Sequence, residues 1–238
     1  TNYTEIYINV ESSLWVYLSD KVTSIATFYS NTPQLKYIHV QNLESITSIG
    51  NNAFEFCPLI GILKLPNNIT GYGIGGQFQG CTGLTSVDFN NASLISIGQN
   101  QFNGCTGLTS ISIPNTVTTI GAEAFAYCTG LASINIPNSV TTIGHRAFEN
   151  CTNAVFNSNN LQLSNLSGAL VSTFLGCEKL NSIDLLNSSI TEFTDNSWRG
   201  VFLNCYLLNS VQLPATINYI GYNAFRDCSS LILFHVNA

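Results

Sequence analysis

The chain has 238 residues, which is enough for one or two domains with a buried core. Charged side chains make up only 8% of it, against about a quarter in a typical soluble protein, while 45% of the residues are apolar, which excludes a disordered chain. The net charge is −6 and the seven Lys and Arg residues are dispersed, which excludes the basic surface that nucleic acids or anionic membranes require.

The beginning of the chain carries no recognisable targeting segment. Thr1 is not an initiator methionine and no secretory signal sequence follows it, so we expect a processed chain or a fragment of a longer one. No apolar run approaches the roughly 20 residues that span a bilayer, and we expect no membrane insertion within this fragment. Residues 1–30 are predicted to form an N-terminal edge or cap segment, with Ile6 and Ile8 in an edge strand and Trp15 covering the first turn.

An internal repeat dominates the rest of the chain. The sequence Phe-x-x-Cys occurs eight times, and successive cysteines are 24, 24, 23, 23, 26, 28 and 23 residues apart. A fixed period of this length indicates a solenoid, and we predict one continuous solenoid domain over residues 31–238. The pairs are Phe54/Cys57, Phe78/Cys81, Phe102/Cys105, Phe125/Cys128, Phe148/Cys151, Phe174/Cys177, Phe202/Cys205 and Phe225/Cys228.

Each unit contains the same predicted elements, and the unit from Cys105 to Phe125 is the clearest. The alternation of Ile111 and Ile113 predicts a strand with one buried face, and Pro114 ends its pairing. Gly121 permits a turn, and the Ala-Phe-x-x-Cys that follows predicts a single helical turn. Stacked units then place their strands side by side in a parallel sheet, about 4.8 Å apart.

Two stretches depart from this pattern. After Cys151 the apolar pair slips to Leu161 and Leu163. After Cys177 the strand is regular, but extra residues from Thr194 to Gly200 carry Trp198 and Arg199. Trp and Arg are the side chains most often found at interface hot spots, so they are candidate binding residues, although Trp198 could equally fill a gap made by the insertion.

The eight cysteines are predicted to be free and buried. Each occupies the same place in its unit, three residues after a buried Phe, where a small apolar side chain fits. The sequence contains no Cys-x-x-Cys and no His at ligand spacing from a Cys, so a zinc site is not expected. Side chains in register also point the same way, which disfavours disulfide geometry.

The outward face of the main sheet, called the open face below, is the second candidate binding surface. Its predicted side chains lie five and seven residues after each Cys and are mostly Ser near the centre. A solvated face that binds nothing would explain the serines equally well. The candidate ligand-binding residues on this face are Asp184, Ser182, Gln162, Asp88, His39 and Tyr37.

No catalytic constellation or cofactor motif is evident. Asp88 and Asp184 are the only acids on the open face and are predicted to lie about 19 Å apart, too far for paired-carboxylate chemistry. The three histidines fall in different regions, and no phosphate-binding loop is present. We therefore expect no enzyme activity and no cofactor or metal.

The motif Leu-x-x-Ile-x-Ile-Pro followed by Ile-Gly-x-x-Ala-Phe resembles the BspA-like class of leucine-rich repeats over residues 31–238. The resemblance implies an α/β solenoid: a curved, right-handed leucine-rich-repeat coil with a concave parallel sheet of nine or ten strands, and short strands and helical turns on the convex side. It also implies a cell-surface or secreted adhesion module that binds a host or microbial surface protein or glycan. A structural spacer without a ligand is the alternative, and a β-helix-type carbohydrate-active enzyme is less favoured.

Overall fold

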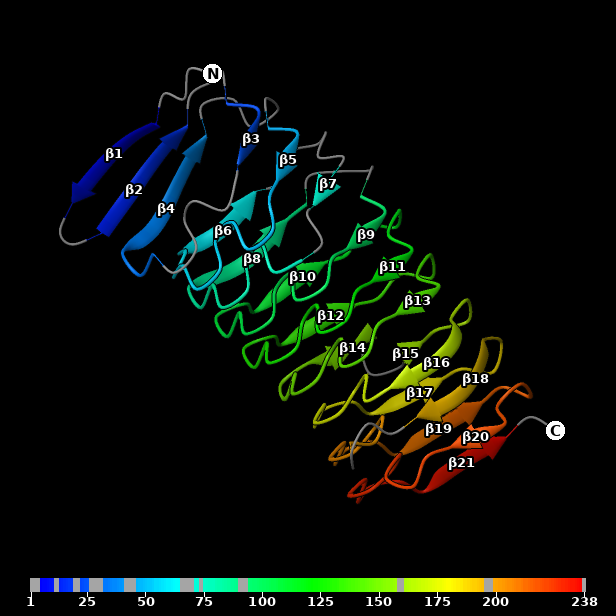
Figure 1. Ribbon diagram of the computed structural model, residues 1–238. Coiled ribbons are helices and arrows are strands. Elements are labelled where there is room, and N and C mark those ends of the chain that lie inside the picture. Colours follow the sequence, from blue (N-terminus) through cyan, green and yellow to red (C-terminus); the bar gives the residue numbers. More distant parts are fainter. Residues whose placement is uncertain are drawn as a thin grey trace.

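The computed structural model describes residues 5–10, 13–18, 22–25, 32–40, 46–64, 71–72, 75–89, 94–157, 161–194 and 199–236. Of residues 5–10, 13–18, 38–40 and 71–72 it describes the backbone alone. Over these residues the chain is a solenoid of parallel strands, and the strands follow one another along one axis from the N-terminal to the C-terminal end (Figure 1). Each coil is named below by the Phe of its Phe-x-x-Cys sequence.

The main sheet takes one strand from nearly every coil. The main-sheet strands are β2 (Ser13–Leu18), β4 (Leu35–Val40), β6 (Gly61–Lys64), β8 (Leu84–Asp88), β10 (Ser110–Ser112), β12 (Ser133–Asn135), β14 (Val155–Phe156), β15 (Leu161–Gln162), β17 (Ser182–Asp184), β19 (Ser210–Leu213) and β21 (Leu233–Val236). These strands fall into three hydrogen-bonded groups that follow one another along the solenoid. Within a group neighbouring strands pair in parallel and, apart from a register shift in β2–β4 and in β6–β8, equivalent positions of the repeat lie side by side, as Ile111 and Ile134 do.

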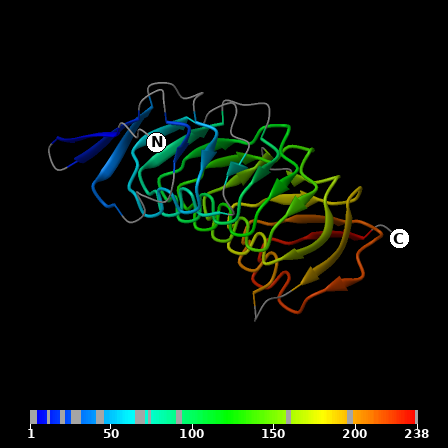
Figure 2. The same ribbon diagram turned by 45° about the horizontal axis from the view of Figure 1, so that its top comes forward.

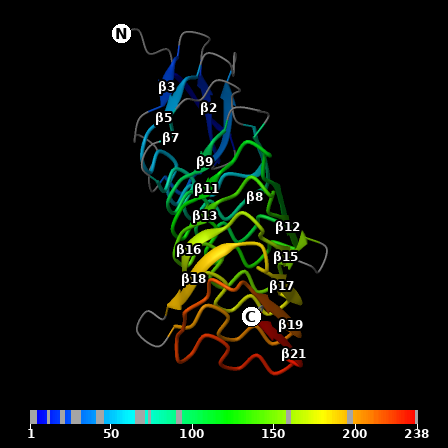
Figure 3. The ribbon, with the colours of Figure 1, turned by 90° about the vertical axis from the view of Figure 1, so that its right-hand side faces the viewer.

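A second series of strands, most of them two residues long, runs along another side of the solenoid, and Figure 3 separates the two series clearly. It arises from the second apolar pair of each unit, where one residue, such as Ile120, is buried and its neighbour Thr119 is half-buried. Its members are β3 (Ser24–Ile25), β5 (Ser48–Ile49), β7 (Gly71–Tyr72), β9 (Ser96–Ile97), β11 (Thr119–Ile120), β13 (Thr142–Ile143), β16 (Ser167–Val171), β18 (Ser189–Thr194) and β20 (Tyr219–Ile220).

A third side, called the turn side below, is formed by the Ala-Phe-x-x-Cys segments and shows as a row of stacked loops in Figure 2. The predicted helical turn is replaced here by tight turns. Alternate N–H groups bond within the coil and to the next coil: Cys128 N–H donates to the Phe125 carbonyl at 3.2 Å, while Phe125 N–H donates to the Ala147 carbonyl at 2.8 Å. Glu123 and Tyr127, two residues before and after Phe125, take left-handed φ angles of 55° and 60°.

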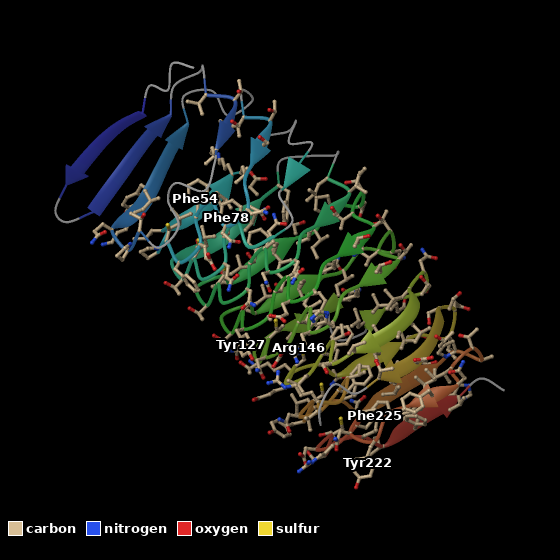
Figure 4. All side chains as sticks on the ribbon, viewed as in Figure 1. Phe54, Phe78, Tyr127, Arg146, Tyr222 and Phe225 are labelled. Atoms are coloured by element: carbon tan, nitrogen blue, oxygen red, sulfur yellow. The ribbon has the colours of Figure 1, made fainter. Side chains whose placement is uncertain are left out.

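A column of phenylalanines forms the centre of the core. Rings of successive coils stack almost parallel, as for Phe125 and Phe148, whose centroids are 5.6 Å apart with 5° between their planes. This spacing lies in the favourable range for aromatic pairs. Phe54 and Phe78 begin the same column (Figure 4).

The buried cysteines make a second column beside the rings. All eight are free, and seven are buried while Cys228 at the C-terminal end is half-buried. Each thiol after Cys57 donates to the Phe carbonyl of the preceding coil, as Cys151 does to Phe125 at 3.1 Å. Cysteine is therefore a small apolar filler that also satisfies a buried acceptor.

The slipped unit after Cys151 divides its main-sheet segment into two short strands. β14 pairs with β12 of the preceding coil, and β15 pairs with β17 of the following coil. Phe156 enters the core beside Phe148 and Phe174, at a position where the neighbouring coils place Ile134 and Ile183. The Asn157 amide then bonds the backbone N–H and carbonyl of Ile136, which lets the ladder end without a lost partner.

At the N-terminal end the parallel order changes. β1 (Glu5–Val10) pairs antiparallel with β2, and β2 pairs in parallel with β4. Ile6 and Ile8 thus lie in a strand at the sheet edge, as predicted. The side chain of Trp15 lies outside the described residues. The division at residue 30 stays a prediction.

Candidate binding face

The centre of the open face is a regular ladder of small polar side chains. Ser86, Ser110 and Ser133 are direct neighbours on β8, β10 and β12, and the last two are exposed. Ser112 and Asn135 form a parallel row two residues further on. The row of serines ends at the half-buried Val155 of β14, where the repeat becomes irregular.

Beyond the irregular coil a row of larger polar side chains crosses four strands. Gln162 of β15 lies beside Asp184 of β17, which lies beside Gln212 of β19 and then His235 of β21. Asp184 is half-buried, and its carboxylate accepts the N–H of Leu186 at 3.0 Å, which orients it on the strand. These four residues are called the polar row below.

Three of the predicted site residues are thus brought together. Gln162 and Asp184 are neighbours in the polar row, and Ser182 lies two residues from Asp184 on the same face of β17. Gln212 and His235 complete the row. Their spacing of seven residues after Cys205 and Cys228 predicted a place on the open face, but they were not among the predicted ligand-binding residues.

The other predicted open-face residues lie at the opposite end. Asp88 of β8 is the neighbour of Lys64 of β6, and Tyr37 and His39 are on β4. The side chain of His39 lies outside the described residues. Four strand spacings separate β8 from β17, about 19 Å, so the structure does not unite Asp88 with the polar row.

Arg199 lies on the turn side rather than on the open face. Its Nη1 is 2.8 Å from Oε1 of Glu149, whose side chain is only 3% exposed. Tyr127 donates its hydroxyl to the same oxygen at 3.0 Å, and Arg146 Nε lies 3.7 Å from Glu149 Oε2. Tyr127 and Arg146 are close together in Figure 4. Trp198 lies outside the described residues.

This ion cluster joins coils that are not neighbours. Arg199 precedes the Phe202 coil and Glu149 belongs to the Phe148 coil, while Ser172 of the intervening coil donates to the Arg199 carbonyl at 2.6 Å. Partial burial, followed by the hydrogen bond to Glu149 and its negative charge, raises the pKa of Tyr127. The sequence interpretation did not identify Glu149 as a site residue. The only indication in the sequence was that an acidic residue directly follows the buried Phe148.

The cysteines are unsuited to nucleophilic or metal chemistry. Burial raises the pKa of Cys105 and of Cys151 to about 12, so both thiols are protonated at neutral pH and neither is the reactive thiolate. Within the described ranges no three His, Cys, Asp or Glu side chains are gathered closely enough to hold a metal ion. In the same ranges no helix has the length and apolarity of a membrane span.

Each coil consists of a strand, a short second strand and a turn, which surround buried Leu, Ile and Phe side chains. This arrangement defines the class of leucine-rich-repeat solenoids. The family described as "BspA type Leucine rich repeat region" matches residues 21–155 and 155–237 in 6 copies. The chain therefore belongs to the BspA-type leucine-rich repeat family, as its repeat motif predicted.

Solved structures agree on the fold. A leucine-rich repeat protein from Bacteroides ovatus superposes with a TM-score of 0.67 at 20% identity, covering 100% of this chain and 76% of that one. A T. pallidum leucine-rich repeat protein gives 0.55 at 20% identity, covering 96% and 88%. One from Eubacterium ventriosum gives 0.54 at 17%, covering 93% and 66%. None of the curated proteins compared with the chain matches it.

Proposed function

We propose that the chain is a non-enzymatic adhesion module, exposed on a cell surface or secreted, that binds a host or microbial surface protein or glycan. The observation that carries this proposal is the polar row, in which four hydrogen-bonding side chains of three kinds, from successive coils, are held in register. The row begins where the repeat is broken, and it therefore offers a ligand a pattern that the uniform coils lack.

The energetics of the sheet favour recognition at this place. The strand backbones are rigidly paired, so the polar row binds without first ordering a loop, and little conformational entropy is lost. Gln162 is exposed, and Asp184 adds one negative charge between two amides. Such a row suits a ligand surface with hydrogen-bond donors and a positive group.

The proposed extracellular location is compatible with the free cysteines. Free thiols are unusual in oxidising compartments, where exposed pairs form disulfides. Here seven of the eight are buried, and burial keeps them protonated, which removes the thiolate that oxidation requires. The family membership supports the same location.

The test is direct binding of fluorescently labelled chain to cultured epithelial cells and to bacterial cells, measured by flow cytometry. We expect saturable binding to one cell type, competed by unlabelled chain and reduced about tenfold in a Gln162→Ala, Asp184→Asn variant. Saturable binding that this variant leaves unchanged would move the site away from the polar row. Protease or glycosidase treatment of the cells identifies the class of partner.

A spacer without a ligand is the alternative, and the serine ladder favours it. Ser86, Ser110 and Ser133 give three coils an almost featureless surface. A spacer predicts no saturable binding to either cell type. The same assay therefore separates the two functions.

A further inference from the structure

The turn side is interrupted by a hollow in the Phe78 coil. The positions three and two residues before the core Phe carry side chains in the neighbouring coils, but here they are Gly75 and Gly76. These two glycines lie in an open depression lined by Asn51 and Asn52 of the preceding coil and by Gln99 and Asn100 of the following coil. The side-chain oxygen of Asn52 reaches over Gly76, to the place where a Cβ on that residue would lie. Gln79 closes a third side.

The floor of this hollow is hydrogen-bonded backbone. Gly76 N–H donates to the Gln99 carbonyl at 2.8 Å, and Asn52 N–H donates to the Gly75 carbonyl at 3.3 Å. A Cβ on Gly75 would collide with the Gln99 carbonyl, and Gly76 has a left-handed φ of 72°, which favours glycine. The stacking of the coils therefore fixes the floor of the hollow, which is an open, shallow depression.

The lining chemistry points to a neutral, hydroxylated ligand. Five of the seven lining residues are Asn or Gln, and none is charged. Each amide offers two N–H donors and a carbonyl acceptor, which matches hydroxyl groups that both donate and accept. The hollow measures about 240 Å³, below the range of about 300–1,000 Å³ for drug-sized sites. This size suits one ring rather than an extended ligand.

An exposed aromatic residue of the preceding coil, Phe56, lies next to Gln79, just beyond the residues that line the hollow. Phe56 N–H donates to the Gln79 carbonyl at 2.7 Å, and the Phe56 ring covers Gly80, the residue after Gln79. The side chain is 50% exposed, and its backbone φ of 56° is uncommon for a bulky residue. Equivalent positions hold mostly Gly, Asn or Asp, and the other aromatic there, Tyr127, bonds Glu149.

We propose that this hollow binds one ring of a neutral carbohydrate, with its hydroxyls bonded to Asn52, Asn100 and Gln79 and its C–H face against Phe56. A peptide is a poorer fit, because peptides are recognised through sheet edges or apolar grooves. The site lies on the turn side and is distinct from the polar row, so its occupation does not depend on the adhesion function.

The test fills the hollow with a side chain that the fold already accepts. Gly76→Asn places in this coil the residue found at the same position as Asn52 and Asn100, both left-handed. Gly176→Asn is a matched control four coils away. Gly176 has a φ of 70°, close to that of Gly76. A Cβ on Gly176 would meet the side-chain oxygen of Asn150 in the preceding coil, just as a Cβ on Gly76 would meet that of Asn52. Asn204 occupies the position equivalent to Gly176 in the next coil. Both variants carry similar strain, but only the first fills the hollow.

Binding is measured by saturation-transfer NMR with methyl glycosides of glucose, galactose, mannose and N-acetylglucosamine, with glucuronic acid as the charged comparison. We expect at least one neutral glycoside to bind, about a tenfold loss in Gly76→Asn, a clear loss in Phe56→Ala, and unchanged binding in Gly176→Asn. The proposal is overturned if none of the four glycosides binds, if Gly76→Asn binds like the wild type, or if Gly176→Asn loses binding equally.

Discussion

Arg199 and Glu149 lie 50 residues apart in the sequence, yet their side chains form an ion pair with 2.8 Å between Nη1 and Oε1. Glu149 is almost fully buried, whereas the Arg199 side chain is 42% exposed. The buried carboxylate needs a donor because an unpaired buried charge is strongly destabilising. Arg199 is therefore a positioning residue for the stack as well as a candidate contact for a ligand.

Replacing Arg199 by Ala should lower the free energy of unfolding by about 1–3 kcal/mol. The loss is smaller than for a fully buried pair, because Arg199 is partly solvated and Tyr127 still donates to Glu149. Urea unfolding followed by fluorescence measures the change. Arg226→Ala is the control: Arg226 pairs with Asp227 in the open, and its loss should cost less than about 0.5 kcal/mol. Equal losses in the two variants would show that the buried pair has no special role.

The phenylalanine column predicts a contrast between inside and outside positions. Phe125 is fully buried between two stacked rings, so Phe125→Ala should cost about 3–5 kcal/mol. Ser112 is exposed on the open face, and Ser112→Ala should cost less than about 0.5 kcal/mol. Thermal melts of the two variants check this contrast. Similar melting temperatures would contradict the assignment of the two faces.

The thiols predict a loss of stability at alkaline pH. Burial raises the pKa of Cys151 from its ordinary value of about 9 to about 12. Above pH 9 the unfolded chain loses thiol protons that the folded chain retains, so the free energy of unfolding should fall as the pH rises from 9 towards 12. Urea midpoints across this range measure the slope, and Cys151→Ala should make it shallower.

Denatured, unreduced protein should also titrate close to eight free thiols, and four disulfides would contradict the buried thiol column.

The sequence was sufficient for the parts of the fold that depend on the period. Buried residues at constant spacing, such as Phe125 and Cys128, require coils stacked in register, and strand pairing follows from that. The left-handed turns were harder to predict from the sequence. Asn or Gly stands two residues before or after many core Phe residues, which favours such turns, but Glu123 and Tyr127 occupy the same positions and are not typical of left-handed backbone. The Glu149–Arg199 pair could not be predicted, because it joins two coils that are not neighbours in the stack, and the spacing of the repeat carries no signal for such a contact.

The final prediction tests whether the adhesion site extends from the polar row to the turn side, by comparing two pairs of substitutions in the cell-binding assay. Trp198→Ala with Arg199→Ala should weaken binding by at least about tenfold, because these residues lie where the repeat is broken and an uninterrupted ladder offers a ligand no distinguishing feature. Ser110→Ala with Ser133→Ala should leave binding unchanged. Since Arg199 also holds Glu149, a Glu149→Gln variant is needed: it weakens the ion cluster but retains the exposed guanidinium. If the Arg199 side chain itself contacts the ligand, the Glu149→Gln variant should still bind cells. Loss of binding in this variant would show that Arg199 acts only by stabilising the stacked coils. Equal loss from the Trp/Arg and Ser pairs, or loss only from the Ser pair, would move the site to the centre of the open face.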